Sequence, residues 1–498
     1  MRRCRCLFLA CLVIAASACA PTAADSVGAE ANALIARYGP AMTPASVIDL
    51  MDQGGGRPLY TLHVALTIDD DAVRLAGTET VRVTNASAED WDRLVFRLYP
   101  NLESYGGDLA ITAAAVDGET VTPALDETRS VLDVPLSTPL PPGQETAVDL
   151  TFETTIIPGH EALYNQLSYL RGVVAAANFF PLLSVYQPGE GWWRETAHPQ
   201  GDAVFSETAF FEVWLTAPAD LIVATSGVIL AEAAGDDGTV TYAIVAPLMR
   251  DFAVMGSAAY RSALRETVDG VRVNVLAYEE AGEARAGLAL AVEALRVFNA
   301  AFGPYPFAEL DVVETLTAAG GIEYPGLIVI ADARWDPADA YFEAVIVHEV
   351  AHQWWYSLVG NDQTRHPWLD ESLTQYAVVV YLRQASGEGA AQARLGWYAD
   401  RWQPYRDTAD DRPIGLPVSA YGDAYFDIVY GKGPLFFQAL AEQIGNDSLL
   451  GALQGYLAAH RYGIVYPADM LRSFEQALGR DDLDGLFRQG VGEFAGLP

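Results

Sequence analysis

The sequence predicts a multidomain α and β protein in which a mostly antiparallel β-rich domain precedes a mainly helical one. Its 498 residues exceed the usual size of one domain, so two or three domains are expected. Apolar residues make up 51% of the chain, which is enough for sizeable cores. The apolar pattern alternates as in strands up to about residue 262 and takes on a helical period after it.

Short alternating runs separated by turn residues characterise the first half. Residues 60–66 read YTLHVAL, and a turn cluster such as Pro141-Pro142-Gly143 punctuates the later runs. Runs of this length and spacing predict antiparallel strands, and we assign residues 58–262 to this β-rich domain. Further strand-like runs occur at 80–83, 94–99, 148–152 and 211–215.

The second half, residues 263–498, combines a few strands with many helices. After a predicted strand at 271–278, residues 281–302 have the period of a long helix. Two further β segments, 310–316 and 327–330, flank a Gly-rich turn, and the pattern is helical from residue 338 onward. We predict that this half forms one mainly helical domain.

The amino terminus has the composition of an export signal. Arginines precede a short apolar stretch, residues 7–18, which falls below the roughly 20 residues that a membrane helix needs. Ala16-Ser17-Ala18 then leads to Cys19 and resembles a bacterial lipobox, in which the cysteine is lipidated. We expect a signal peptide over residues 1–19 and a spacer over 20–57. The protein is then exported and anchored to a bacterial membrane through Cys19, or else simply secreted after ordinary signal cleavage.

Composition also limits the binding chemistry. All four cysteines lie at or before Cys19, so the rest of the chain has no disulfide and no thiolate ligand. Any metal must therefore sit on His, Asp or Glu. The formal charge of −35 disfavours nucleic acid as a partner.

A zinc-binding pattern occurs at residues 344–359, which read AVIVHEVAHQWWYSLV. His348 and His352 are four residues apart, so a helix places both imidazoles on one face, ready for a zinc ion at about 2 Å. Glu349 directly follows the first histidine and is placed to reach a water rather than the metal, as in HExxH zinc peptidases. The alternative is a helix with two core histidines, but a buried glutamate between them would be costly without a function.

A catalytic zinc site takes a third protein ligand and leaves one position open. Glu371 follows His352 after 18 intervening residues, a gap that suits a helix end, a short loop and the first turn of a second helix. Asp370 points about 100° away on that helix, and His366 lies in the loop beside a proline. We therefore predict one Zn²⁺ per chain on His348, His352 and Glu371.

These motifs resemble the membrane alanyl aminopeptidase and leukotriene A4 hydrolase family of gluzincin zinc metallopeptidases. HEVAHQWW and the glutamate of WLDES fit that family's zinc pattern. Residues 320–326, GGIEYPG, are similar to its GxMEN exopeptidase motif, with Ile322 and Tyr324 in place of methionine and asparagine. Residues 430–433, YGKG, are similar to its Tyr-x-Lys-Gly motif. The resemblance extends over roughly 60–498.

The resemblance implies a saddle-like N-terminal β domain and a thermolysin-like catalytic domain. It implies that Glu323 binds the free α-amino group of the substrate and that Gly320 and Gly321 line the substrate-binding site beside it. It also implies that Tyr430 donates a hydrogen bond to the oxyanion of the tetrahedral intermediate. Lys432 is assigned a structural role, as a partner of some carboxylate. Many relatives carry a long C-terminal helical domain, which we do not expect here because the sequence continues for only 68 residues after Tyr430.

We therefore interpret the chain as a zinc metallopeptidase, and more specifically as an aminopeptidase acting on peptides with a free N-terminus. A thermolysin-like endopeptidase would use the same zinc site without needing Glu323. Epoxide hydrolysis occurs in the resembled family, but no residue here favours it. A non-catalytic surface binding protein would have lost Glu349, a zinc ligand or Tyr430, and all of these are present.

Overall fold

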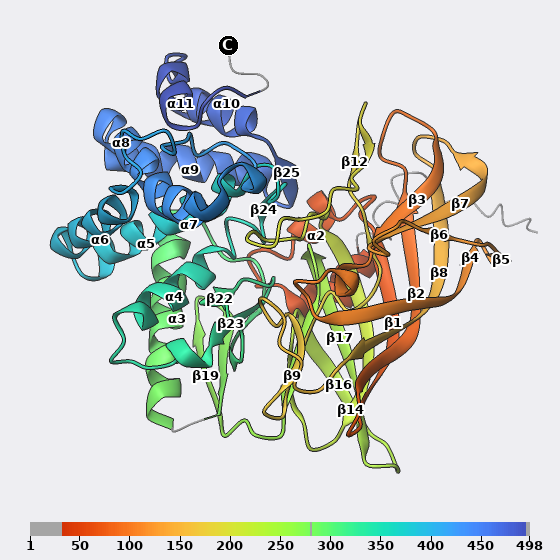
Figure 1. The fold of residues 1–498 in the computed structure, drawn as a ribbon. Helices are drawn as coiled ribbons and strands as arrows, with labels where there is room; N and C mark the ends of the chain where they lie inside the picture. Colours follow the sequence, from red (N-terminus) through yellow and green to blue (C-terminus); the bar gives the residue numbers. More distant parts are fainter. Residues whose placement is uncertain (1–31, 279–280, 495–498) are drawn as a thin grey trace, which may run out of the picture.

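Residues 32–278 and 281–494 are described in the computed structural model of the protein (Figure 1). The predicted signal peptide and Cys19 lie outside the described residues. Figure 1 shows the β-rich part on one side, the helices of the C-terminal part on the other, and strands β19, β22 and β23 where the two meet. The predicted fold class, a β-rich domain followed by a mainly helical one, is confirmed.

An eight-stranded sheet is the largest layer of the β-rich part, in the order β16-β17-β14-β1-β2-β8-β4-β5. All neighbouring pairs are antiparallel except β1 and β14. Buried and more exposed side chains alternate along β8, so one face of the sheet covers the core. The strands are β1 Leu59–Ile68, β2 Val73–Thr84, β4 Gly107–Val116, β5 Glu119–Thr120, β8 Glu145–Ile156, β14 Ala209–Pro218, β16 Val228–Ala234 and β17 Thr239–Met249.

Two four-stranded antiparallel sheets and a two-stranded ribbon complete this part. The first sheet has the order β15-β18-β10-β9 and the second β11-β3-β7-β6. The five runs predicted from alternation overlap β1, β2, β3, β8 and β14, whereas many of the shorter strands carry no alternation that sequence could reveal. The remaining strands are β3 Trp91–Arg97, β6 Ala124–Leu125, β7 Val131–Leu140, β9 Leu167–Leu170, β10 Val173–Ala177, β11 Leu182–Leu183, β12 Tyr186–Gln187, β13 Gly191–Trp192, β15 Ile222–Thr225 and β18 Ala253–Ser257.

The chain enters a new sheet at Ser262. This five-stranded sheet has the order β19-β20-β21-β23-β22, with β20, β21 and β23 parallel and both edge strands antiparallel. Helix α3 connects β20 to β21, as a parallel pair requires. The bounds are β19 Ser262–Val268, β20 Val271–Ala277, α3 Ala281–Ala301, β21 Glu309–Thr315, β22 Gly321–Ile322 and β23 Leu327–Ala331.

Helices make up most of the chain after β23. In the described ranges, no helix is both long enough and apolar enough to cross a membrane. A two-stranded parallel sheet of β24 and β25 joins distant parts of this region. The elements are α4 Ala340–Ala351, β24 Val359–Asn361, α5 Glu371–Ala385, α6 Glu388–Trp402, α7 Tyr425–Asp427, a π-helical turn Ile428–Lys432, α8 Gly433–Ile444, α9 Asn446–His460, β25 Gly463–Val465, α10 Pro467–Leu478 and α11 Asp484–Gly490; α2 (Asp49–Gln53) precedes β1.

The described part of the predicted spacer, residues 32–57, packs against both domains. Tyr38 is buried, and its hydroxyl donates a 2.5 Å hydrogen bond to Glu212 Oε1 of β14. Asp49 is buried as well and accepts a 2.8 Å hydrogen bond from the Tyr462 hydroxyl of the helical part. This segment therefore ties the two domains together, through contacts between positions too far apart in sequence for a local pattern to reveal them.

Arg250, directly after β17, is the main polar link between the two domains. Its side chain is fully buried, and it donates hydrogen bonds to the carbonyls of Ser206 (3.0 Å), Tyr356 (2.7 Å) and Gly463. A Cβ on Gly360 would lie 2.2 Å from the guanidinium carbon, so β24 can pass this close only as glycine. Burial lowers the pKa of Arg250 to about 10, so the side chain stays charged at neutral pH.

We expect Arg250→Met to lower the free energy of unfolding by about 3 kcal/mol or more, because it leaves several buried carbonyls without donors. Arg472→Met, at a side chain that is 64% exposed, is the matched control and should change stability by less than about 0.5 kcal/mol. Urea unfolding of both variants measures the difference. A loss for Arg250→Met no larger than that of the control would contradict the proposed link.

Candidate active site

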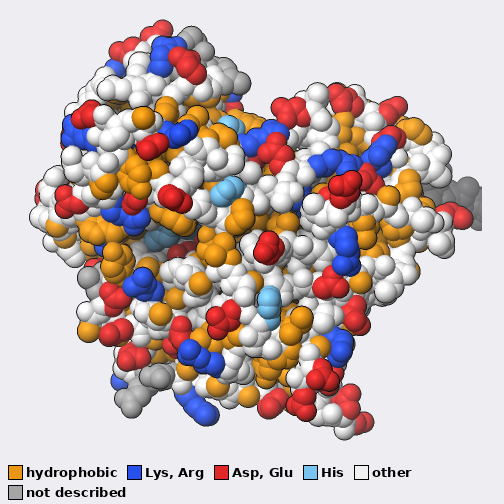
Figure 2. Space-filling model, in the orientation of Figure 1, with side chains coloured by type: hydrophobic (Ala, Val, Ile, Leu, Met, Phe, Trp, Pro, Cys, Tyr) orange, Lys and Arg blue, Asp and Glu red, His pale blue; other side chains and the backbone are white. Residues whose placement is uncertain are grey.

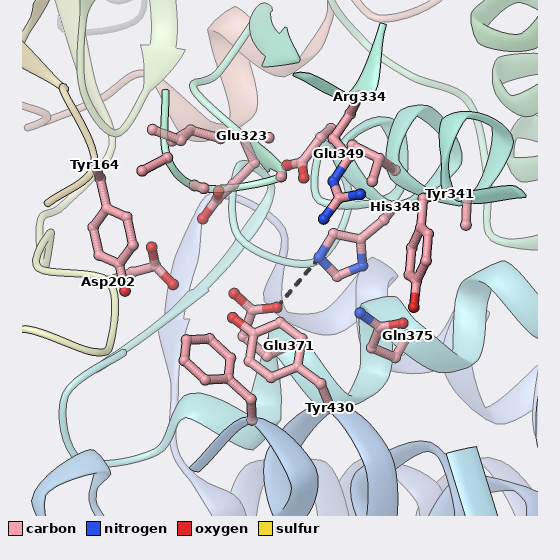
Figure 3. Close-up of a pocket in the computed structure, with 18 of the residues that line it drawn as sticks. Tyr164, Asp202, Glu323, Arg334, Tyr341, His348, Glu349, Glu371, Gln375 and Tyr430 are labelled. Atoms are coloured by element: carbon pink, nitrogen blue, oxygen red, sulfur yellow. Dashed lines mark ion pairs between the residues drawn. The ribbon is translucent and has the colours of Figure 1, made fainter. Parts of the chain in front are cut away.

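A cavity of about 320 Å³ opens where loops of the β-rich part face the helical part. Tyr164, Gln166 and Asp202 line it from the β side, and α4, α5, α6 and the π-helical turn supply most of the rest. Figure 2 shows a recess on this face, with histidine and acidic side chains visible inside it and Lys or Arg side chains at its edge. Figure 3 shows how the labelled side chains converge.

Helix α4 supplies the two histidines. It begins at an N-cap, Asp339, whose side chain accepts a 2.9 Å hydrogen bond from the backbone of Tyr341. The N–H of His352 still donates to the carbonyl of His348 (3.2 Å), so the last turn keeps both imidazoles on one face, as predicted from their spacing. Their Nε2 atoms lie 3.1 Å apart.

Glu371 completes the triad from the first turn of α5. Asp370 is the N-cap of this helix and accepts a 2.8 Å hydrogen bond from the backbone N–H of Glu371. Glu371 Oε2 lies 3.3 Å from His348 Nε2 and 3.5 Å from His352 Nε2, the former marked by a dashed line in Figure 3. The helix N-terminus also favours a negative carboxylate at this position.

The protonation of His352 is set by its second nitrogen. Nδ1 lies 2.9 Å from the carbonyl oxygen of Trp355. Because a carbonyl only accepts, Nδ1 carries the proton in the neutral ring and Nε2 presents a lone pair towards His348 and Glu371. Glu371 Oε2 and His348 Nδ1 are buried atoms without a hydrogen-bond partner among the described residues.

These three ligand atoms have the spacing of a tetrahedral metal site. Bonds of about 2.0–2.1 Å to a tetrahedral zinc ion separate neighbouring ligand atoms by about 3.3 Å. The observed separations are 3.1, 3.3 and 3.5 Å. Two lone pairs and a carboxylate oxygen this close repel one another unless a cation lies between them, so the residues fit zinc.

Glu349 lies against the Gly-rich turn. A Cβ on Gly321 would meet the Glu349 carboxyl group at 2.5 Å, so glycine is required there, whereas a Cβ on Gly320 would make only an ordinary 3.5 Å contact with Val345. Burial raises the pKa of Glu349 well above its ordinary value, and the carboxylate of Glu323 adds to this shift. A carboxyl group with a raised pKa is a stronger proton acceptor than an ordinary one, as a general base requires.

The segment that carries Glu323 is fastened to α4 by Gln353. The Gln353 side chain accepts a 2.9 Å hydrogen bond from the backbone N–H of Gly326 and donates a 3.1 Å bond to the carbonyl of Tyr324. Gln363 donates to Glu323 Oε1 at 3.3 Å and to Asp370 at 2.9 Å. Gln353 therefore holds the backbone around Glu323, and Gln363 holds its carboxylate.

Tyr430 lies on the π-helical turn between α7 and α8, its ring centroid 6.2 Å from that of His348. Such turns are frequent at functional sites. Burial, with the Glu371 carboxylate adding, raises the pKa of Tyr430 well above its ordinary value. The hydroxyl is therefore protonated and able to donate.

The other residues of the YGKG motif are structural. Lys432 Nζ donates to Asp411 (2.6 Å) and to the carbonyl of Arg412 (2.9 Å), which identifies the carboxylate partner that sequence left open. A Cβ on Gly433 would lie 1.9 Å from the hydroxyl of Ser372, so α8 can approach α5 this closely only with glycine.

The structure brings the predicted residues into one place. His352 lies fully buried behind the cavity wall, while the wall itself contains Gly320, Gly321, Glu323, His348, Glu349, Glu371 and Tyr430. Of the two alternative ligands, Asp370 caps α5 and His366 lies in a separate surface depression with Arg365.

Asp202, Gln353 and Gln363 were missed by the sequence analysis. Asp202 comes from a loop of the β-rich part, and its carboxylate lies within 4.8 Å of those of Glu323 and Glu371. Gln353 and Gln363 position Glu323, as described above. Gln353 directly follows the HExxH residues and is a polar side chain in an apolar run, which is the one feature that would have drawn attention to it.

Residues 287–489 match the Peptidase family M1 domain. This segment of the chain therefore resembles peptidase family M1. Aminopeptidase N of Streptomyces lividans is 28% identical over 193 residues, which are 36% of this chain and 22% of that protein. Aminopeptidase M1-B of Oryza sativa subsp. japonica is 27% identical over 307 residues, 55% of this chain and 34% of that protein. The chain therefore aligns with only about a fifth to a third of the length of these curated relatives.

Crystal structures of other proteins also resemble the fold of this chain outside residues 287–489. The crystal structure of an M1 zinc metallopeptidase from Deinococcus radiodurans superposes with a TM-score of 0.64 at 21% identity and covers 89% of this chain and 95% of that one. A mutant of the Deinococcus radiodurans protein has been solved bound to a Tyr-Ser-Ala substrate. The shared fold thus includes the β-rich part together with the M1 domain.

We expect His352→Ala to lose bound zinc, because two ligands and water hold the ion far more weakly than three. Glu349→Gln, at the adjacent carboxyl group, should keep about one zinc per chain, since it is not among the three ligands. Elemental analysis of the purified variants, with circular dichroism as a check on folding, gives the answer. Full zinc occupancy in folded His352→Ala would remove this residue from the ligand set.

Proposed function

We propose that the protein is a zinc-dependent aminopeptidase that removes residues from the free N-terminus of peptides. The observation that carries this proposal is the position of Glu323. One ligand atom from each of Glu323, Glu349 and His352 lies within 4.8 Å of the others, so a second buried carboxylate stands directly beside the proposed base and metal ligands. The aminopeptidase names of the M1 relatives support the same reading.

The proposed chemistry assigns one task to each residue. His348, His352 and Glu371 hold zinc, which when bound supplies a Lewis acid that polarises the scissile carbonyl and acidifies water. Glu349 takes the proton from the attacking water and returns it to the leaving amine. Tyr430 donates its hydroxyl hydrogen to the oxyanion of the tetrahedral intermediate.

Glu323 is the residue that we expect to bind the N-terminal ammonium group of the substrate and so to restrict cleavage to the first peptide bond. A carboxylate buried to 6% exposure needs a cationic partner, and among the described residues no Lys or Arg forms an ion pair with it. The α-ammonium of a peptide supplies that charge and hydrogen-bonds to the carboxylate. Binding the ammonium here places the first peptide bond, one residue away, next to Glu349.

We expect Glu323→Ala to lower kcat/KM on an alanyl anilide by roughly 30- to several-thousand-fold, because one partner of a desolvated charge pair is removed. The N-acetylated anilide should be a poor substrate for the wild type and should lose little in the variant. Glu349→Gln is the matched control and should lower the rates on both substrates by at least about tenfold. Equal wild-type cleavage of free and acetylated anilides would instead indicate an endopeptidase on the same zinc site.

We further propose that the protein is exported and held at a bacterial membrane by lipid on Cys19. The support is the charged start, the short apolar stretch and the small residues before Cys19. Stable anchoring takes two lipid signals, as a lipidated and acylated N-terminal cysteine would provide.

Membrane fractionation tests this proposal. The wild-type protein should sediment with membranes, and Cys19→Ser should be found unprocessed or in the soluble fraction. The enzyme activity of the variant reports separately on folding. A soluble wild type with the same processing as Cys19→Ser would favour simple secretion.

A further inference from the structure

The cavity carries opposite charges on its two sides. Asp202 and Glu323 gather on one side of the zinc ligands, and Figure 3 shows Asp202 with Tyr164 on the side of Glu371 that lies away from Tyr341. The lining also contains three arginines: Arg334, Arg394 and Arg401. In a chain with a net charge of −35, a group of arginines at the active-site cavity is unexpected from composition alone.

Arg394 belongs to the side opposite Asp202. It lies on α6 together with Trp397, three residues on and therefore on the same helix face. The Arg394 guanidinium lies 5.3 Å from the Trp397 ring centroid, and the Trp397 ring lies 6.0 Å from that of Tyr341. Figure 3 places Tyr341 beside His348, across the zinc ligands from Asp202.

The three arginines differ in their partners. Arg401 forms a 2.9 Å ion pair with Asp427, and Arg334 forms a 3.5 Å ion pair with Asp339. Among the described residues, no carboxylate forms an ion pair with Arg394, and its guanidinium lies over the faces of Trp397 and Tyr398. Arg250 also lacks an acidic partner, but it donates to backbone carbonyls, whereas Arg394 is half-buried and makes no side-chain hydrogen bond to any described residue.

Contacts of this kind leave the guanidinium free to bind a ligand. A position over an aromatic face attracts the guanidinium and uses none of its five N–H donors. A planar fork held in this way matches a carboxylate, to which arginine donates two parallel hydrogen bonds. The group to be bound is therefore an anion of the substrate, at the end of the cavity away from Glu323.

We propose that Arg394 binds the C-terminal carboxylate of short peptide substrates, so that the enzyme is selective for short peptides with both ends free. This inference rests on the proposed aminopeptidase function. The ammonium lies at Glu323 and Asp202, the first peptide bond at Glu349, and the chain runs on towards Arg394. An extended chain spans about 3.3–3.6 Å per residue, so only a short peptide has its carboxylate within this cavity. The cavity volume of about 320 Å³ lies at the small end for ligand sites.

The test compares tri-alanine with its C-terminal amide in the zinc-loaded full chain. The wild type should cleave the free acid with a kcat/KM about tenfold or more above that of the amide, as expected for a charged hydrogen-bonded pair. Arg394→Gln should bring this ratio close to one. Arg394→Lys, which keeps the charge and loses the fork, should give an intermediate ratio. Arg472→Gln, at an exposed arginine of α10, should keep the wild-type ratio.

Other results would contradict the proposed role of Arg394, the proposed aminopeptidase function, or both. Equal cleavage of acid and amide by the wild type, or an unchanged ratio in both Arg394 variants, would exclude Arg394 as the carboxylate anchor. A second outcome would show that Arg394 binds an acidic side chain of the substrate instead. In that case the wild type would cleave acid and amide equally but prefer Ala-Glu-Ala amide to tri-alanine amide, and Arg394→Gln would lose this preference. In these cases cleavage of the alanyl anilide would leave the aminopeptidase proposal standing. No cleavage of either peptide or of the anilide would overturn both.

Discussion

The site is governed by the cost of burying several carboxyl groups close together. Removing such groups from water is unfavourable unless cations or hydrogen bonds compensate. Burial raises the pKa of four of them, that of Asp370 to about 8, whereas the two histidines hold the pKa of Glu371 below its ordinary value. Two positive charges would compensate these groups: a metal ion at the histidines and, in the function that we propose, an ammonium group at Glu323. The carboxyl groups concerned are Asp202, Glu323, Glu349, Asp370 and Glu371.

Rigid polar links keep these groups in position. Gln353 ties the segment of Glu323 to α4, and Gln363 ties Glu323 to the N-cap of α5. Arg250 holds the β-rich part against the helical part by hydrogen bonds to backbone carbonyls. Asp202 comes from the β-rich part, so its position beside Glu323 depends on how the two domains pack. The selectivity that we propose therefore depends on contacts well outside the zinc triad.

Charge polarity gives the cavity a direction. In our proposal, the acidic side attracts the start of a peptide and Arg394 binds its end, while the bond to be cleaved lies between them. Two charged anchors of opposite sign select substrates by length as well as by sequence, because both contacts form only when the two ends are correctly spaced. A strongly acidic protein would otherwise repel the carboxylate of its own substrate.

Local patterns in the sequence determined much of the molecule. The four-residue spacing of His348 and His352 and the position of Glu371 after a helix cap follow from the helical period, which is a property of neighbouring residues. The alternating strands, and the change from a strand period to a helical period after about residue 262, likewise follow from neighbouring residues. Gly321 and Gly433 were visible as motif residues, although the contacts that require glycine there were not.

Tertiary structure alone decided the rest. Asp202 comes from the β-rich part and Arg394 from the helical part, and neither belongs to a sequence motif. Only the packing of the two domains places them in one cavity. The short segment around Tyr38 and Asp49 reads as a spacer because its partners, Glu212 and Tyr462, are far away in sequence. A pattern read along the chain reports the period of an element, whereas the contacts between distant elements depend on how those elements pack.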